Sequence, residues 1–257
     1  MVHEKSAAVS GRDHYAQIYG SHLETEAEWL RMGAREKADS VEILLARHGI
    51  RPASLLELGA GTGAVIQECQ RRGIAREYAA IDYSSDATEY LRAHSSGIDV
   101  VQADITDPAL AAPAKEYDVV VASHVVEHLE EPERFLAGLR RISFGHAVIE
   151  VPLENLAAGR IKARLWDRTG NRAGHVQFFD VPAFEALLRR GGLEVVDRRV
   201  YAPVQRLENI RFVTRTNRRG TAGLIKSALT GRYLPMLLGP AWRRLYYAHC
   251  AVLARPL

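Results

Sequence analysis

SLLEL at residues 54–58 runs into the glycine loop GAGTG at 59–63, and AVIQECQRRG follows at 64–73. A short apolar run that enters a glycine turn is typical of a buried strand, while Val65, Ile66 and Cys69 suit a helix that Gly73 closes. Glycines let a ligand approach the backbone closely, and a helix N-terminus offers unpaired N–H groups to an anionic group. The stretch therefore predicts a strand, a ligand-binding loop and a helix.

The same alternation continues along the chain. We expect further strands at 78–82, 100–105, 117–123, 146–152, 193–202 and 246–255, and further helices at 13–49, 84–97, 126–142 and 181–192. The run YDVVVAS at 117–123 is largely apolar, as is typical of a strand buried in a parallel sheet. Alternating strands and helices predict βαβ crossovers, and therefore an α/β fold with a doubly wound, mostly parallel sheet of seven strands.

The chain divides into three regions that we expect to form one structural domain. Residues 1–49 are expected to form an N-terminal helical cap, and residues 50–202 the ligand-binding core. Residues 203–257 are expected to hold a basic insertion or lid, over 203–245, followed by the last strand. A length of 257 residues suits one large domain of this kind.

The composition is that of an ordinary globular protein. Hydrophobic residues make up 47% and charged residues 25%, which argues against a disordered or fibrous class. The two cysteines, Cys69 and Cys250, do not make a disulfide framework. The N-terminal segment MVHEKSAAVSGRDH lacks the apolar core of a signal peptide, and no apolar run is long enough to span a membrane. We expect a soluble protein of the reducing cytoplasm.

The charges are distributed unevenly. Of 34 Lys and Arg and 31 Asp and Glu, twelve basic residues but only one acid, Glu208, lie from Arg198 to Leu257. Residues 1–197 therefore carry 22 basic and 30 acidic side chains. A basic segment attracts anions such as phosphates, nucleotides or acidic lipid headgroups, although it can equally be a solvated face. We expect an anionic acceptor or a peripheral membrane contact at this segment.

The glycine loop alone leaves two ligand classes open, because Gly59, Gly61 and Ala64 also fit the looser dinucleotide pattern G-x-G-x-x-G/A. The later strand ends separate them, since Asp82 ends one expected strand and Asp104 lies at the end of another. With these residues in place, the part of the chain from about residue 50 to residue 200 resembles the class I S-adenosylmethionine-dependent methyltransferases, whose first motif is E-x-G-x-G-x-G. A nicotinamide dinucleotide is the alternative ligand.

The resemblance implies a Rossmann-like methyltransferase fold with S-adenosylmethionine as the cofactor. In the proteins that this chain resembles, Glu57 and the loop glycines Gly59, Gly61 and Gly63 would surround the amino-acid part of the cofactor. Asp82 would bind the ribose, because the two oxygens of one carboxylate can accept both vicinal hydroxyl protons.

The resemblance also assigns the adenine side of the site. Tyr83 is expected to cover the adenine ring, and Asp104 with the backbone amide of Ile105 to contact the adenine edge. His124 is expected near the cofactor. Taken singly, Asp82 and Asp104 could each be a turn or helix-cap aspartate, but their agreement with the glycine loop favours cofactor binding.

The segment SHVVEHL at 123–129 begins at the end of an expected strand and carries three ionisable side chains. His124, Glu127 and His128 have i, i+3, i+4 spacing, so on a helical turn they would share one face. That face would point into the cleft beyond the strand ends, where open α/β sheets bind ligands. In metal-free members of the resembled family, such a segment has His124 near the cofactor and Glu127 and His128 in structural or acid–base roles.

His175, in GHVQFF, supports a second interpretation. The segment also resembles that of metal-dependent members, namely ubiquinone-pathway O-methyltransferases and small-RNA 3′-end 2′-O-methyltransferases, although His124 replaces the first glutamate of E-x-x-E-H. The resemblance makes His124, Glu127, His128 and His175 candidate metal ligands. Three imidazoles and one carboxylate suit a divalent transition metal better than Mg²⁺, which prefers oxygen ligands.

We expect methyl transfer to a small polar acceptor, with a hydroxyl of a sugar or glycosylated natural-product metabolite as the first choice. A hydroxyl must lose its proton as it attacks the methyl group, so His128 and His175 are the candidate catalytic bases. N-methylation of an amino sugar is an alternative. So is 2′-O-methylation of RNA or a nucleotide, although no recognisable RNA-binding module accompanies the arginines. A regulatory protein that binds the cofactor is the non-enzyme alternative.

Overall fold

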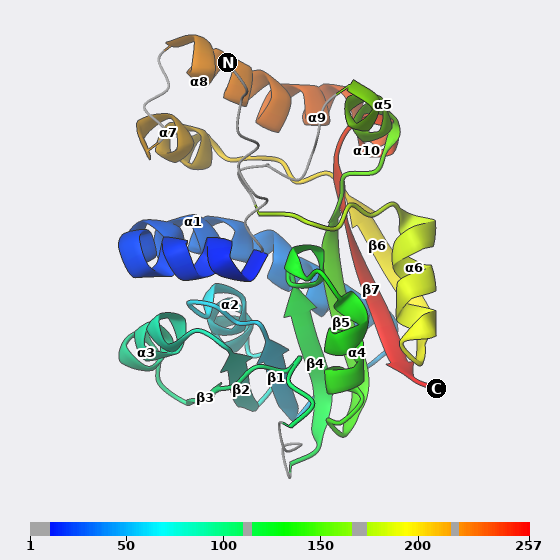
Figure 1. Cartoon of the computed structure of the whole chain (residues 1–257). Coiled ribbons are helices and arrows are strands. Elements are labelled where there is room, and N and C mark those ends of the chain that lie inside the picture. Colours follow the sequence, from blue (N-terminus) through cyan, green and yellow to red (C-terminus); the bar gives the residue numbers. More distant parts are fainter. Residues whose placement is uncertain (1–10, 110–114, 166–173, 217–220) are drawn as a thin grey trace, which may run out of the picture.

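The computed structural model describes residues 11–109, 115–165, 174–216 and 221–257, and the side chains of 11–14 and 16 are not described. Its centre is a seven-stranded sheet in the order β3-β2-β1-β4-β5-β7-β6 (Figure 1). The strands are β1 Ser54–Leu58, β2 Glu77–Asp82, β3 Ile98–Gln102, β4 Tyr117–Ser123, β5 Phe144–Leu153, β6 Leu193–Tyr201 and β7 Ala248–Pro256.

The first five strands are parallel, whereas β7 runs antiparallel to both β5 and β6. Strand β1 lies between β2 and β4 in the sheet. The chain therefore leaves β1 toward β2 on one side and later returns to place β4 on the other side. A crevice opens at such a point beyond the carboxyl ends of the strands. The expected doubly wound, mostly parallel sheet of seven strands is confirmed.

Helices cover both faces of the sheet. One face carries α1 Gly11–Arg47 and α2 Ala64–Arg72, with α3 Ser85–His94 beside them, and the other carries α4 Pro132–Leu139 and α6 Val181–Arg190. Each helix buries an apolar stripe, such as Leu44 of α1 on the first face and Phe135 and Phe184 on the second. These two separate cores hold the strand ends in place.

Local structure departs from the sequence-based expectation at three points. The helix expected over 126–142 is wrong as one element: it is a 3-10 turn, η1 Val126–His128, followed by α4, which begins only at Pro132 because proline fits the first turn of a helix. Strand β3 ends at Gln102, so Asp104 lies in a loop. Helix α5 Ala157–Leu165 was not expected.

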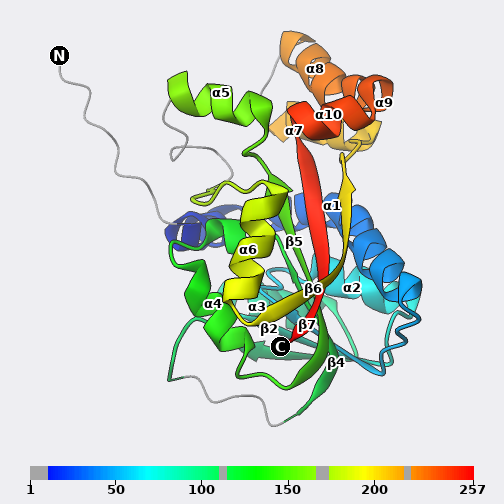
Figure 2. The same ribbon diagram turned by 90° about the vertical axis from the view of Figure 1, so that its right-hand side faces the viewer.

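The insertion lies between β6 and β7, as expected, and is helical. It contains α7 Leu207–Thr216, α8 Thr221–Ala228, the π-helical turn η2 Leu229–Tyr233, α9 Leu234–Leu238 and α10 Pro240–Leu245. With α5, these helices gather at one end of the molecule, beyond the carboxyl ends of the parallel strands (Figures 1 and 2). No helix among the described residues is long and apolar enough to cross a membrane.

Candidate functional site

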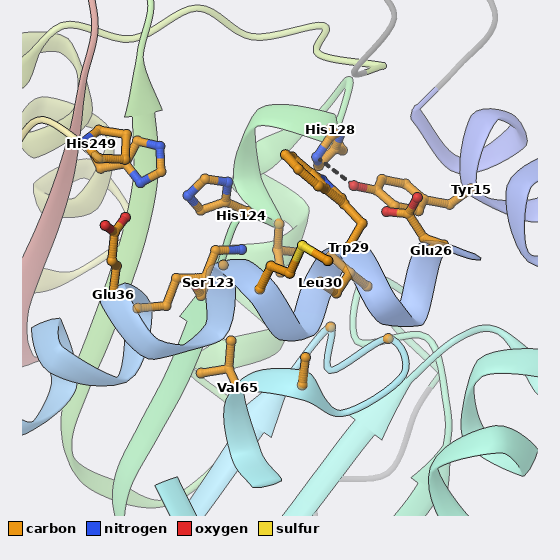
Figure 3. A pocket seen from close by; sticks show the side chains of 18 of the residues that line it. Tyr15, Glu26, Trp29, Leu30, Glu36, Val65, Ser123, His124, His128 and His249 are labelled. Atoms are coloured by element: carbon orange, nitrogen blue, oxygen red, sulfur yellow. Dashed lines mark hydrogen bonds between the residues drawn. The ribbon is translucent and has the colours of Figure 1, made fainter. Parts of the chain in front are cut away.

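A cavity of about 870 Å³ lies where the parallel strands end, between α1 and the insertion. Its walls come from the glycine loop, the ends of β2 and β4, the inner side of α1 and the helices of the insertion. Figure 3 shows α1 crossing the cavity with Tyr15, Glu26 and Trp29 along it. The N-terminal helix is therefore one wall of the site.

The glycine loop has the backbone that its sequence predicts. Gly61 and Gly63 have φ values of 54° and 78°, in the left-handed region that favours glycine. A Cβ at Gly61 would lie 2.6 Å from the hydroxyl of Tyr19, and one at Gly63 would lie 2.2 Å from Leu91 Cδ1. Side chains at either position would therefore close the space next to the loop.

Asp82 holds the loop from the end of β2. Its Oδ2 accepts a hydrogen bond from the Gly61 amide at 2.7 Å, and its Oδ1 accepts one from the Ser84 amide at 2.9 Å. Burial raises the pKa of this carboxyl, while the backbone N–H donors oppose the rise. Tyr83 follows it, and both residues line the cavity.

The loop after β3 brings Asp104 and Ile105 to the same cavity. Asp104 Oδ1 accepts hydrogen bonds from the amide and the hydroxyl of Thr106, at 2.9 and 2.7 Å. Asp104 is therefore a turn aspartate, as its alternative interpretation expects, and it also lies at the wall of the cavity.

Glu57 is buried at the base of the glycine loop. Its Oε2 accepts a hydrogen bond from the Ile66 amide of α2 at 2.9 Å. Burial raises its pKa to about 8, against the opposing effects of that hydrogen bond and of the Lys37 ammonium. Lys37 comes from α1 and also lines the cavity. Nothing in the sequence marks Lys37 as a site residue, because a lysine on an amphipathic helix has no distinguishing pattern.

His124 does not share a helical face with Glu127 and His128, so that expectation is wrong. It has a φ of 59°, which is rare outside glycine, and it precedes the 3-10 turn that holds the other two residues. Its Nε2 lies 3.5 Å from Glu150 Oε1, and its ring packs against His249 at a centroid distance of 4.5 Å. We call His124, Glu150 and His249 the His124 cluster.

Two tyrosines complete the surroundings of the His124 cluster. The hydroxyl of Tyr201 donates to Glu150 Oε1 at 2.8 Å, and the hydroxyl of Tyr247 lies 3.0 Å from His249 Nε2. Burial alone would raise the pKa of Glu150, but the neighbouring His124 and His249 imidazoles hold it well below its usual range. Burial lowers the pKa of His124.

Glu127, His128 and His175 form a second group, which we call the His128 cluster. The ligand-capable atoms of these three residues lie within 4.8 Å of one another, and all three residues are buried. The His128 and His175 rings are 4.9 Å apart between centroids. Glu127 Oε1 also lies 3.4 Å from His124 Nδ1, so it stands between the two clusters. The four candidate ligands are thus neighbours, but they do not converge on one point.

Hydrogen bonds orient both imidazoles of the His128 cluster. Nδ1 of His128 donates to the carbonyl of Gly174 at 3.1 Å, and Nδ1 of His175 donates to the Glu154 carboxylate at 2.5 Å. In the neutral imidazoles Nε2 therefore carries the lone pair. The hydroxyl of Tyr15 lies 3.3 Å from His128 Nε2 (Figure 3).

Several buried polar atoms of the two clusters make no hydrogen bond within the part of the chain that the structure describes. They include both carboxylate oxygens of Glu127, Oε2 of Glu150 and Nε2 of His124. Burial raises the pKa of Glu127 to about 7, while His175 opposes the rise. Buried polar groups are normally satisfied, so atoms like these point to a ligand that completes the site.

Comparison with known proteins assigns the family. Residues 27–198 match the model of the methyltransferase domain family, which is more than half of the chain. The chain belongs to this family. The matched range contains the glycine loop and Asp82, together with both histidine-bearing segments of the His128 cluster.

The relatives of this methyltransferase domain share a shorter stretch. A protein of Mycobacterium tuberculosis, named a probable S-adenosylmethionine-dependent methyltransferase, is 32% identical over 97 residues, which are 38% of this chain and 33% of that protein. The malonyl-[acyl-carrier protein] O-methyltransferase of Halalkalibacterium halodurans is 32% identical over 93 residues, 35% of this chain and 34% of that protein. The matches thus span about one third of these relatives.

The fold of the methyltransferase domain extends over nearly the whole chain. A crystal structure of an S-adenosylmethionine-dependent methyltransferase from Thermotoga maritima superposes with a TM-score of 0.58 at 13% identity, over 94% of this chain and 99% of that one. At such low identity the likeness establishes the architecture only.

Several residues in or next to the cavity come from segments that contain no sequence motif. Glu150 lies on β5, Tyr201 ends β6 and His249 lies on β7, and these strands are neighbours in the sheet. Trp29 of α1 stacks on Phe212 of α7 at a centroid distance of 6.0 Å. The last strands and the insertion thus complete the half of the cavity that lies away from the glycine loop.

Proposed function

We propose that the protein transfers the methyl group of S-adenosylmethionine to a hydroxyl of a small polar acceptor, with a sugar or glycosylated metabolite as the first choice. The observation that carries this proposal is the pair of oriented imidazoles, His128 and His175, at the cavity that the glycine loop also lines. A base next to a cofactor site is what removal of a hydroxyl proton requires.

Glu57, the loop glycines and Asp82 would bind the cofactor, with Tyr83, Asp104 and Ile105 around its adenine and His124 near it. The acceptor oxygen would attack the methyl carbon as the bond from carbon to the sulfonium breaks, which leaves S-adenosylhomocysteine. The hydroxyl proton would pass to Nε2 of His128 or His175 and then to water. Glu154, hydrogen-bonded to His175, would stabilise the imidazolium.

The His128 cluster also fits a divalent transition metal. Its two imidazoles are held through Nδ1 by outer acceptors, as is usual for histidine ligands, and the buried oxygens of Glu127 make no hydrogen bond with any described residue. Glu127, His128 and His175 would hold the ion, with His124 reaching it only through a change of rotamer or through water. A bound metal would lower the pKa of the acceptor hydroxyl.

The test is a screen of sugars and nucleotide sugars with cofactor labelled in the methyl group, with and without a chelator, combined with elemental analysis of the untagged protein. We expect a labelled methyl ether. Loss of turnover with the chelator, at unchanged cofactor affinity, would select the metal-assisted form over the metal-free base. Product analysis separates O- from N-methylation. Cofactor binding with no turnover on any acceptor would favour a regulatory role.

A further inference from the structure

The outer surface of the helices beyond the strand ends is strongly apolar. It consists of α5, α8, η2, α9 and α10, and each of these elements contacts the next in the order α5, α10, α9, η2, α8. Figures 1 and 2 show them gathered at one end of the molecule. We call this surface the α5–α10 face. Its large exposed apolar side chains are Ile161, Leu165, Leu224, Ile225, Leu229, Tyr233, Met236, Leu237, Leu238 and Leu245.

Exposure of these residues is high enough to need an explanation. Leu237 is 80% exposed, Leu165 62% and Met236 60%. Single exposed leucines are common on protein surfaces, but contiguous groups of them mark sites that contact another apolar phase. Such a face is typical of a surface that docks on a partner.

The charge of the face indicates which partner. Segments 157–165 and 221–247 contain no Asp or Glu at all. Their exposed cations are Arg160, Lys162, Arg164, Lys226 and Arg244. Apolar side chains mixed with cations and without acids are the composition of helices that lie in the interface of an anionic bilayer. A second copy of this face would instead bring cations against cations.

The inner side of the same layer faces the cavity. Trp242 is buried and lines the cavity together with Tyr246 and Tyr247. Tyr246 is also 37% exposed, and Lys162 of α5 lies 5.0 Å above its ring. One layer of helices thus separates the acceptor half of the cavity from the apolar face.

We propose that the α5–α10 face docks on the surface of a membrane that contains anionic phospholipids. The apolar side chains enter the boundary between headgroups and acyl chains, while the cations contact the phosphates. This brings the wall of the cavity to the bilayer, so an acceptor whose polar group is attached to a lipid tail can reach the site. The docking itself does not depend on the methyl-transfer proposal.

The test is co-sedimentation of the full chain with lipid vesicles, in the absence of cofactor and acceptor. Vesicles of phosphatidylcholine containing about one third phosphatidylglycerol should bind the protein, and vesicles of phosphatidylcholine alone should bind it at least tenfold more weakly. Binding should weaken as added salt shortens the Debye length. Leu237→Glu should reduce the partition coefficient at least tenfold.

Ile43→Glu is the matched control, since it adds the same charge at an exposed apolar residue of α1, outside the face. It should bind like the unchanged protein. Circular dichroism and cofactor titration check that Leu237→Glu remains folded, as its exposure leads us to expect. Absent or lipid-independent binding overturns the proposal. So does a dimer in light scattering that Leu237→Glu dissociates, because a second copy would then cover the face.

Discussion

The two halves of the cavity are built in opposite ways. In the cofactor half, Glu57, Asp82 and Asp104 lie within fewer than fifty consecutive residues, and each accepts a hydrogen bond from a nearby backbone amide. In the acceptor half, Glu127 lies in the 3-10 turn after β4 and Glu150 lies within β5, and both have carboxylate oxygens that make no hydrogen bond with the residues that the structure describes. Backbone amides thus hold the three carboxylates of the first half, although Thr62 Oγ1 of the glycine loop makes no hydrogen bond among the described residues. The second half leaves both oxygens of Glu127 and one of Glu150 without such a donor.

This difference indicates where stability is traded for function. A buried polar atom without a partner costs about 1–3 kcal/mol, and a non-glycine residue in the left-handed region costs of the order of 1–3 kcal/mol. Both features occur in the acceptor half, at Glu127 and at His124. Variants that separate acceptor chemistry from cofactor affinity are therefore the sharpest tests of the comparison.

The largest effect is expected at the bases. His128→Ala or His175→Ala should lower kcat by roughly 10²–10⁴, the usual contribution of a positioned acid or base, while cofactor affinity stays within about twofold. Labelled-methyl kinetics and calorimetry measure the two quantities. His48→Ala is the matched control, because His48 pairs with Asp197 on the surface, away from the cavity. If both histidine variants lose cofactor affinity instead, the two halves are not separable.

The converse variant is Asp82→Ala. It should weaken S-adenosylmethionine binding by about 1.5–3 kcal/mol, or roughly 10–150-fold, because it removes a charged acceptor for the ribose and the hydrogen bond that fixes Gly61. Calorimetry measures the affinity. Asp118→Ala is the control: Asp118 also accepts backbone hydrogen bonds, from Ala53 and Ser54, at the other end of β1. Equal affinity in both variants, or binding of NAD in place of the cofactor, would contradict the assignment of the loop.

A smaller effect is expected where the insertion meets α1. Phe212→Ala removes the stacking partner of Trp29 and should raise the KM for the acceptor by roughly 5–10-fold, since an aromatic pair contributes about 0.5–1.5 kcal/mol beyond its buried area. Cofactor affinity should change less. Paired titrations of cofactor and acceptor measure the two affinities. Equal losses of cofactor and acceptor affinity would mean that the Trp29–Phe212 contact belongs to the cofactor half.

The contrast between the halves also explains what the sequence could predict. The glycine loop, Asp82 and Asp104 lie close together in the chain, so their spacing can be recognised in the sequence. The sheet and its insertion can be predicted from the hydrophobic periodicity. The break at Pro132 follows from a local rule that the helical periodicity obscured, because proline starts a helix rather than continuing one. The left-handed backbone of His124 has no such local signal, so the shared helical face of His124, Glu127 and His128 was wrong.

The residues that sequence analysis missed in the acceptor half have a common cause. Glu150 and His249 stand almost one hundred positions apart and meet only because β5 pairs with β7, with their atoms 3.3 Å apart. Each is the single polar residue in the buried apolar run of its strand, 147–153 for Glu150 and 248–254 for His249, and that departure from the strand pattern is the one signal that marks them. Glu154 contacts His175 across a loop and carries no such signal.

The smallest effect concerns the pH dependence of the unliganded protein and tests whether the cofactor half is fully satisfied. Burial raises the pKa of Glu57 to about 8, although the Ile66 amide and Lys37 oppose the rise. A carboxyl whose pKa is raised in the folded state favours folding at a pH below its unfolded pKa, and this contribution is lost as the pH rises through about 8. Glu57→Gln keeps the shape and the acceptor for the Ile66 amide but cannot ionise. Its Tm should therefore match that of the unchanged protein near pH 5 and exceed it by roughly 3–6 °C near pH 9, about 1–2 kcal/mol.

Thermal unfolding across this range measures the difference in Tm. The control is Glu77→Gln, because Glu77 is an exposed carboxyl on β2. Tm curves that stay parallel at all pH values would mean that Glu57 is ionised throughout, with Lys37 as its full counter-ion.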